Sequence, residues 1–165
     1  MPTSMLRHKL KHLFNADDGS LPEIELNFNN FTDVEHAFSI LKSLSGENTE
    51  YILSLENHIV SIEYEDTSTK LCANSPIGSS HIMFNNIKSI SGKPIPSLGV
   101  GFWENGLEFN YCMAEIWNAQ SLEFFFEILL KLSKLPTFKN ISTPLYSEED
   151  SLLFLSAWEA YRRNS

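Results

Sequence analysis

The spacing of hydrophobic residues changes along this chain, and that change constrains the fold more than any other feature. In two stretches near the start, and again through the last third, apolar residues recur every three to four positions, as on one face of a helix. Between residues 51 and 113 they instead alternate with polar residues, which is typical of half-buried strands. Strands and helices segregated in this way favour an α+β fold with a mostly antiparallel sheet.

Helical spacing predicts four helices, of which the first is basic and amphipathic and belongs to the N-terminal segment 1–14. Thr32 and Glu35 have the spacing of a capping box, so we expect the second helix to begin there. Ser147 and Asp150 have the same spacing at the start of the last helix. The predicted ranges are 5–14, 34–44, 121–135 and 151–163.

Alternation predicts five strands, and two further stretches are harder to assign. Asn105-Gly106 is the strongest hairpin signal, because both residues tolerate the positive φ of a tight turn. We therefore expect a single α+β domain over residues 1–165, with helices packed on a mostly antiparallel sheet of about five to six strands. The predicted strands are 23–28, 51–55, 59–64, 98–103 and 107–113; the stretch 70–73 could be a short strand, and 81–90 a strand or a helical turn.

The composition predicts a cytoplasmic protein with a hydrophobic core of its own. Hydrophobic residues make up 42% of the chain and aromatic residues 12%, which is ample for a domain of this size. The two cysteines, Cys72 and Cys112, have no CxxC spacing, and we expect them to be reduced and buried. Neither a signal peptide nor an apolar run long enough to span a bilayer is recognised, so no membrane association is expected.

Charge is distributed unevenly between the N-terminal segment and the rest of the chain. Residues 1–14 carry three basic side chains and no acidic one. Because the net charge of the whole chain is −9, the net charge of residues 15–165 is −9 − 3 = −12. A body this negative repels nucleic acid and attracts a basic partner. The alternative interpretation is that the acidity only keeps the protein in solution.

No motif for catalysis, cofactor binding or metal binding is recognised. GxGxxG, P-loop and GxSxG patterns are all missing from the sequence. His8 and His12 share a helix face but have no third ligand with suitable spacing. We therefore expect no catalytic residue, no metal and no cofactor. Two alternatives stay open. The first is a small hydrolytic enzyme with an unrecognised site, built either from carboxylates or from Cys72 or Cys112 with His81. The second is an adaptor that docks through its N-terminal helix.

One stretch carries a resemblance to a known class of proteins. It is a predicted hairpin, GFWENGLEFNY from Gly101, followed by a helix that begins within IWNAQSLEFFF from Ile116. Together with the acidic α+β character of the chain, it is similar to the immunity proteins of bacterial contact-dependent growth inhibition. The resemblance implies a cytoplasmic protein that binds and neutralises a cognate toxin domain, often a basic nuclease, by blocking its active site.

The polar side of the predicted hairpins is the candidate surface for such a partner. Carboxylates there could occupy the positions of substrate phosphates, and complementary charge accelerates association. Trp103 is a candidate aromatic anchor, because tryptophan is enriched among the residues that dominate binding energy. A solvated sheet face explains the same residues equally well. The candidate partner-binding residues are Glu56, Glu63, Glu65, Asp66, Trp103, Glu104 and Glu108.

Overall fold

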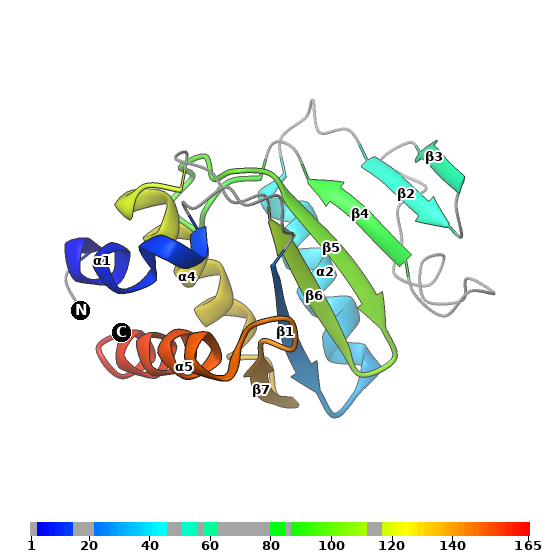
Figure 1. Cartoon of the computed structure of the whole chain (residues 1–165). Helices are drawn as coiled ribbons and strands as arrows, with labels where there is room; N and C mark the ends of the chain where they lie inside the picture. The colour runs from blue at the N-terminus through cyan, green and yellow to red at the C-terminus, as the bar shows by residue number, and fades with distance from the viewer. Residues whose placement is uncertain are drawn as a thin grey trace.

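The computed structural model describes residues 3–14, 22–45, 51–55, 58–62, 80–84, 87–111 and 117–165. These residues form four helices and seven strands, shown in Figure 1. The helices are α1 (Thr3–Phe14), α2 (Phe31–Leu44), α4 (Ala119–Leu132) and α5 (Glu148–Arg163). The strands are β1 (Glu23–Phe28), β2 (Tyr51–Leu55), β3 (His58–Ile62), β4 (Ser80–Phe84), β5 (Leu98–Trp103), β6 (Gly106–Tyr111) and β7 (Phe138–Ser142).

The strands form one open antiparallel sheet in the order β3-β2-β4-β5-β6-β1-β7. The fold is therefore α+β, as the segregated periodicities predict. The expected count of about five to six strands is not confirmed. Two elements explain the difference. The stretch 81–90, for which the sequence allows a strand or a helical turn, contains residues 81–84 of β4. The strand β7 is not expected from the sequence, because its five residues show no clear alternation. The stretch 70–73 lies outside the described residues.

Side-chain caps fix where the helices begin. The Ser147 hydroxyl accepts a hydrogen bond from the N–H of Asp150 at 3.1 Å, which confirms the predicted cap. The helix α5 begins directly after it, at Glu148, three residues before the predicted range. The expected capping box at Thr32 is wrong. The N-cap of α2 is Asn30, whose side-chain oxygen accepts from the Thr32 N–H at 2.8 Å. Asparagine competes well with threonine as a cap, and it lies two residues earlier, so α2 begins at Phe31.

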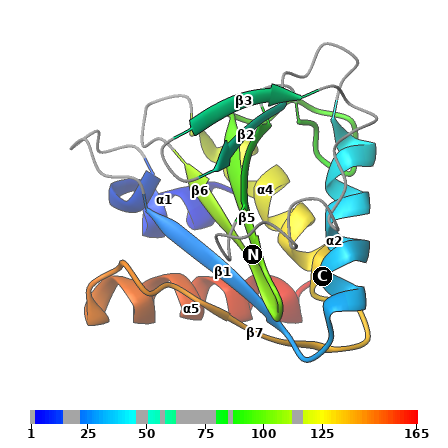
Figure 2. The same cartoon turned by 90° about the vertical axis from the view of Figure 1, so that its right-hand side faces the viewer.

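The hydrophobic core lies between one face of the sheet and the helices. Alternate residues of β1 and β6 point into it, which is the period-two pattern that the sequence predicts. The first five residues of β5 are all buried, and its apolar side chains in the core are Leu98, Val100 and Phe102. From α4, Phe125 packs edge-on against Phe109 of β6, with ring centroids 5.5 Å apart. From α2, Phe38 packs in the same manner against Phe102 of β5 at 4.6 Å. Figure 2 looks onto the opposite side of the sheet, with α1, α4 and α5 behind the strands.

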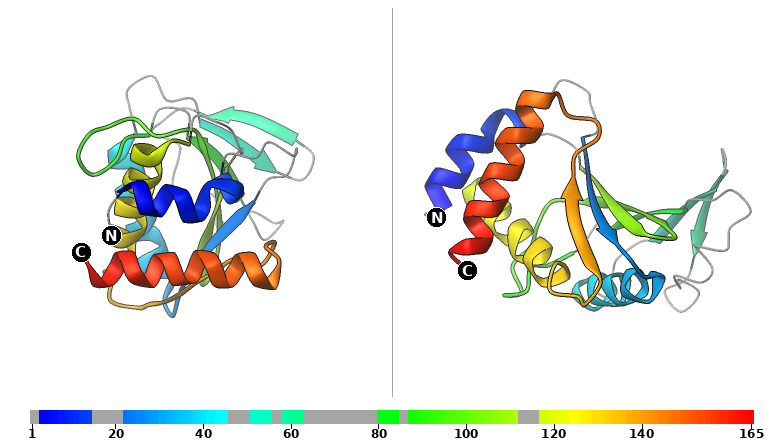
Figure 3. Two further views of the ribbon diagram at one scale, coloured as in Figure 1. Left: turned by 60° about the vertical axis from the view of Figure 1, so that its left-hand side comes forward. Right: turned by 90° about the horizontal axis from the view of Figure 1, so that it is seen from below.

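The N-terminal helix is an integral part of this core. Leu6, Leu10 and Phe14 of α1 are at most 1% exposed. The Phe14 ring stacks on Tyr111 of β6 at 4.4 Å, and the Tyr111 hydroxyl donates to the carbonyl of Leu13. Figure 3 shows α1 lying beside α5, with which it runs antiparallel. Lys9 and Lys11 of α1 are exposed, whereas its leucines are used in packing.

Asp33 links the start of α2 to the start of β7. Its side chain is buried, and its carboxylate accepts hydrogen bonds from the N–H and the hydroxyl of Thr137, both at 2.6 Å. Burial raises the pKa of Asp33, but the two Thr137 hydrogen bonds and the contact with His36 outweigh it and lower the pKa below its ordinary value. The ionised form is therefore the one that holds the two segments together.

Asp33→Asn should lower the free energy of unfolding at pH 7 by about 1–3 kcal/mol, because it weakens hydrogen bonds to a charged acceptor. A carboxylate whose pKa is lowered by folding stabilises the fold above its unfolded pKa, and this contribution is lost as the pH falls through the folded value. The difference between the two proteins should therefore shrink below about pH 4. Urea denaturation at pH 7 and pH 3 measures it. His36→Gln is the control and should change stability by less than about 0.5 kcal/mol, because His36 is exposed.

The longest apolar run of the sequence, from Leu122 to Leu135, forms most of α4 and lies in the core. Within the described ranges, no helix is long and apolar enough to cross a membrane. Cys72 and Cys112 lie outside the described residues, so their expected burial is not tested.

Candidate functional site

The side of the sheet that faces away from the helices carries polar residues on β6, β1 and β7, and Trp103 on β5. We call this surface the open face. Its residues alternate with the core residues of the same strands, and none of the described helices covers it (Figures 2 and 3). No lysine or arginine is among its members. The open face comprises Glu23, Glu25, Asn27, Trp103, Glu108, Asn110, Asn140 and Ser142.

Three carboxylates gather at the centre of the open face. Strand pairing sets Glu25 of β1 opposite Glu108 of β6, with Glu23 two residues away on the same side. One carboxylate oxygen from each lies within 4.8 Å of the others. Like charges directly opposite each other on neighbouring strands destabilise a sheet. The fold therefore keeps these three side chains together at a cost in stability.

The pKa values of Glu23 and Glu25 are both raised above their ordinary value. Burial raises the pKa of Glu23, and its hydrogen bond and charge interaction with Glu108 raise it further. Burial also raises the pKa of Glu25, against a hydrogen bond that the Ser142 hydroxyl donates to it. Asn27 holds Ser142 in place by donating to its hydroxyl at 3.0 Å. The cluster thus has hydrogen-bond support at its β7 side and unneutralised charge at its centre.

Glycines on the open face make room for its two largest functional side chains. Glu108 folds across Gly101 of β5, where an added Cβ would lie 2.7 Å from the Glu108 carboxylate oxygen. The Trp103 ring lies over Gly106, where an added Cβ would lie 2.6 Å from the ring. Both side chains are therefore held against the sheet rather than left free in solvent.

Glu23→Gln should raise the melting temperature by about 1–3 °C at pH 7, because it removes one of three crowded charges. A carboxyl whose pKa is raised by folding destabilises the fold increasingly as the pH rises through that pKa. The gain should therefore be smaller at pH 4 than at pH 7, which thermal unfolding at both values measures. Glu148→Gln is the control: Glu148 is exposed in the first turn of α5, where negative charge is favourable, so its loss should not raise stability.

Only some of the predicted partner-binding residues can be placed. Trp103 and Glu108 lie on the open face, and Glu104 is exposed in the turn between β5 and β6. Glu56, Glu63, Glu65 and Asp66 lie outside the described residues. Glu23 and Glu25 were not predicted, although the alternation of Glu23-Ile24-Glu25-Leu26 signals that both glutamates share the polar side of a strand. What brings them to Glu108 is the pairing of β1 with β6.

The chemistry of the open face is that of cation binding. Oxygen-only ligand sets suit Ca²⁺ and Mg²⁺, and the same oxygens accept hydrogen bonds from the ammonium and guanidinium groups of a protein partner. The alternative of an adaptor that docks through α1 has only the polar side of that helix to use, because its leucines are buried. The alternative of a Cys/His enzyme rests on Cys72, Cys112 and the His81 side chain, which are not described.

Comparison of the chain with models of known protein families, with curated proteins and with solved structures found no match. No relative therefore carries a function over to this chain. A function for this chain must therefore be inferred from the geometry and charge of the open face.

Proposed function

We propose that this protein is an inhibitor of the immunity type, which binds a basic toxin domain, such as a nuclease, through the open face and thereby neutralises it. The observation that carries the proposal is the cluster of Glu23, Glu25 and Glu108, with carboxylate oxygens within 4.8 Å of one another on a face that none of the described helices covers. The resemblance of the stretch from Gly101 to Phe126 to immunity proteins agrees with it.

Electrostatics favours a basic partner for this face. The open face holds three carboxylates and no lysine or arginine, and residues 15–165 carry a net charge of −12. A lysine or arginine from a partner that approaches the cluster would relieve the repulsion among the carboxylates. The long-range field would also raise the association rate, to about 10⁸–10⁹ M⁻¹s⁻¹ at low salt in favourable cases.

The support beneath the cluster suits recognition of one particular partner. Its side chains project from hydrogen-bonded strands, and rigid elements hold binding groups more accurately than loops do. Trp103 adds an aromatic surface that is already immobilised over Gly106, so little side-chain entropy is lost on binding. Carboxylates on a flat face can occupy the phosphate sites of a nuclease and so exclude its substrate.

The test uses the protein that is encoded by the neighbouring gene, of which only the C-terminal domain is expressed. We expect the two proteins to co-purify, the domain to stop growth when expressed alone, and co-expression of this protein to restore growth. We also expect the association rate to fall steeply as salt rises from 50 to about 500 mM. If the toxic domain neither co-purifies with this protein nor is neutralised by it, the proposal is wrong.

A further inference from the structure

The connection between β4 and β5 lies against the outer side of α4. We call residues 87–97 of this connection the strap. The Ser89 hydroxyl accepts from the Lys93 N–H at 3.1 Å, and the Ser89 N–H donates to the Lys93 carbonyl, which closes a turn around Gly92. Gly92 has a φ of 81°, a conformation that glycine adopts at little cost. The strap is thus an ordered element.

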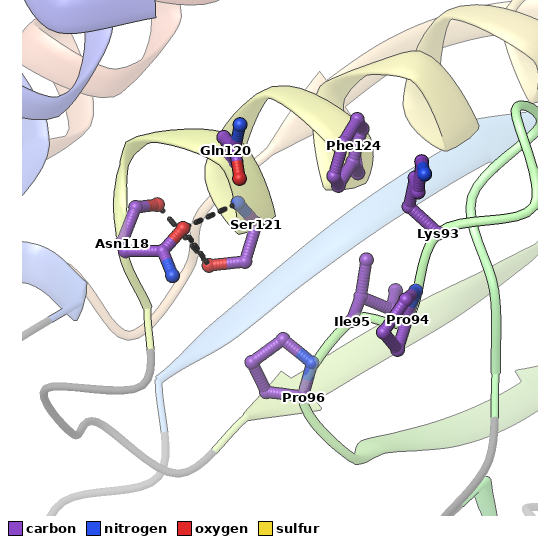
Figure 4. Close-up of a pocket in the computed structure, with 8 residues that line it drawn as sticks. All are labelled: Lys93, Pro94, Ile95, Pro96, Asn118, Gln120, Ser121 and Phe124. Atoms are coloured by element: carbon purple, nitrogen blue, oxygen red, sulfur yellow. Dashed lines mark hydrogen bonds between the residues drawn. The ribbon is translucent and has the colours of Figure 1, made fainter.

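Two pockets lie where the strap meets α4. The first, of about 440 Å³, opens beside the strap residues Lys93 to Pro96 and the first turns of α4 (Figure 4). Its apolar walls include Ile95 and Phe124. The second, of about 340 Å³, has Ile90 and Leu130 as its apolar walls. Ile90 is 47% exposed, which is unusual for a large aliphatic side chain.

Most of the α4 residues in the two pockets follow one stripe of that helix. Four of them recur at intervals of three and four and therefore share a side of the helix: Gln120, Phe124, Glu127 and Lys131. Lys134 follows in the turn after α4. This stripe is opposite the face that packs on the sheet. The α4 residues of the two pockets are centred about eight positions apart, which corresponds to about 12 Å along the helix.

The rim of this surface is positively charged. Lys93 stands at the first pocket, and Lys131 and Lys134 at the second. None of the three forms a salt bridge with a carboxylate among the described residues. Glu127 and its neighbour Glu123 are the acids on this side of α4. Burial and then Glu123 raise the pKa of Glu127, while hydrogen bonds from Ser91 lower it. The Oε2 atom of Glu127 is buried and has no hydrogen-bond partner among the described residues.

We propose that the strap and the outer stripe of α4 form a second binding surface, which takes an extended acidic peptide segment of a protein partner. Two apolar side chains of the segment would enter the two pockets, and its carboxylates would contact Lys93, Lys131 and Lys134. Side chains four residues apart on an extended chain point the same way and stand about 13 Å apart, close to the separation of the pockets. This surface is separate from the open face, so it does not rest on the function proposed above.

A fluorescein-labelled peptide provides the test, with fluorescence anisotropy as the measurement. The peptide has ten residues, all aspartate or glutamate except for two leucines four positions apart. We expect saturable binding to the full-length protein with a Kd below about 500 µM. Lys131→Gln/Lys134→Gln should weaken it at least tenfold, and Ile90→Ser at least threefold. Circular dichroism of each variant checks that it is folded.

Lys9→Gln/Lys11→Gln is the matched control, because it also removes two positive charges from exposed lysines. Lys11 lies in the last turn of its helix, α1. It should change the Kd by less than twofold. Equal weakening by both double variants would show non-specific attraction and overturn the proposal. Equal binding of a peptide with serines in place of the leucines would also overturn it, as would equal binding of a single-stranded oligonucleotide of the same charge. The proposal is wrong as well if no saturable binding is found below about 1 mM.

Discussion

Phe125→Ala should lower the free energy of unfolding by about 3–5 kcal/mol, the largest stability effect that we expect from a single substitution in this protein. Phe125 is fully buried, and its ring contacts those of Phe14, Phe109, Trp117 and Phe126, with centroids 5.5 to 6.4 Å apart. These neighbours belong to α1, β6, the start of α4 and α4 itself. Removing the ring leaves a cavity where three separate segments meet, so the surroundings cannot close it easily.

Urea denaturation followed by circular dichroism measures this loss. Leu152→Ala is the control, because Leu152 lies on α5 with 61% of its surface exposed and should change stability by less than about 0.5 kcal/mol. A loss below about 1.5 kcal/mol for Phe125→Ala, with an unchanged denaturant slope, would contradict a tightly packed aromatic centre.

Glu25→Lys/Glu108→Lys should weaken binding of the basic toxin domain at least 100-fold. The substitutions convert the centre of the open face from attraction to repulsion, and close charge pairs in a protein interface are worth about 1.5–7 kcal/mol. Surface plasmon resonance at two salt concentrations measures both rate constants. We expect a slower association at low salt and a faster dissociation at both.

Glu148→Lys/Glu149→Lys makes the same change of charge at the exposed start of α5, away from the open face. It should weaken binding no more than about fivefold, through the long-range field alone. Equal weakening by the two double variants would mean that only net charge matters, and the open face would lose its assigned role. The open-face variant should still bind the acidic peptide as the original protein does, because the strap surface is separate.

Local patterns predict most of the elements of this fold. All four helices lie within a few residues of their predicted ranges, and the hairpin at Asn105-Gly106 is present. Where prediction was wrong, the competing choices were close in energy. Asn30 and Thr32 are both good helix caps, and nothing local decides between them. In β7 only Ile141 is buried, so its alternation is too weak to recognise without knowledge of its partner strand.

The acidic cluster shows why the candidate site could be predicted only in part. The alternation of β6 predicts that Glu108 is on a polar side of the sheet, and that of β1 predicts the same for Glu23 and Glu25. Their meeting depends on β1 pairing with β6, whose residues follow about eighty positions later in the chain. Such non-local pairing is specified by the whole core and not by any short stretch.

The place of α1 in the core has a consequence for synthesis on the ribosome. Leu13 and its hydrogen-bond partner Tyr111 are separated by 98 residues. At about 5–20 residues per second, α1 therefore waits about 5–20 s after its own translation before this partner is made, and longer for α5. Throughout that time its leucines have no native surface to cover them, so α1 is exposed to non-native contacts for longer than the described elements that are made after it.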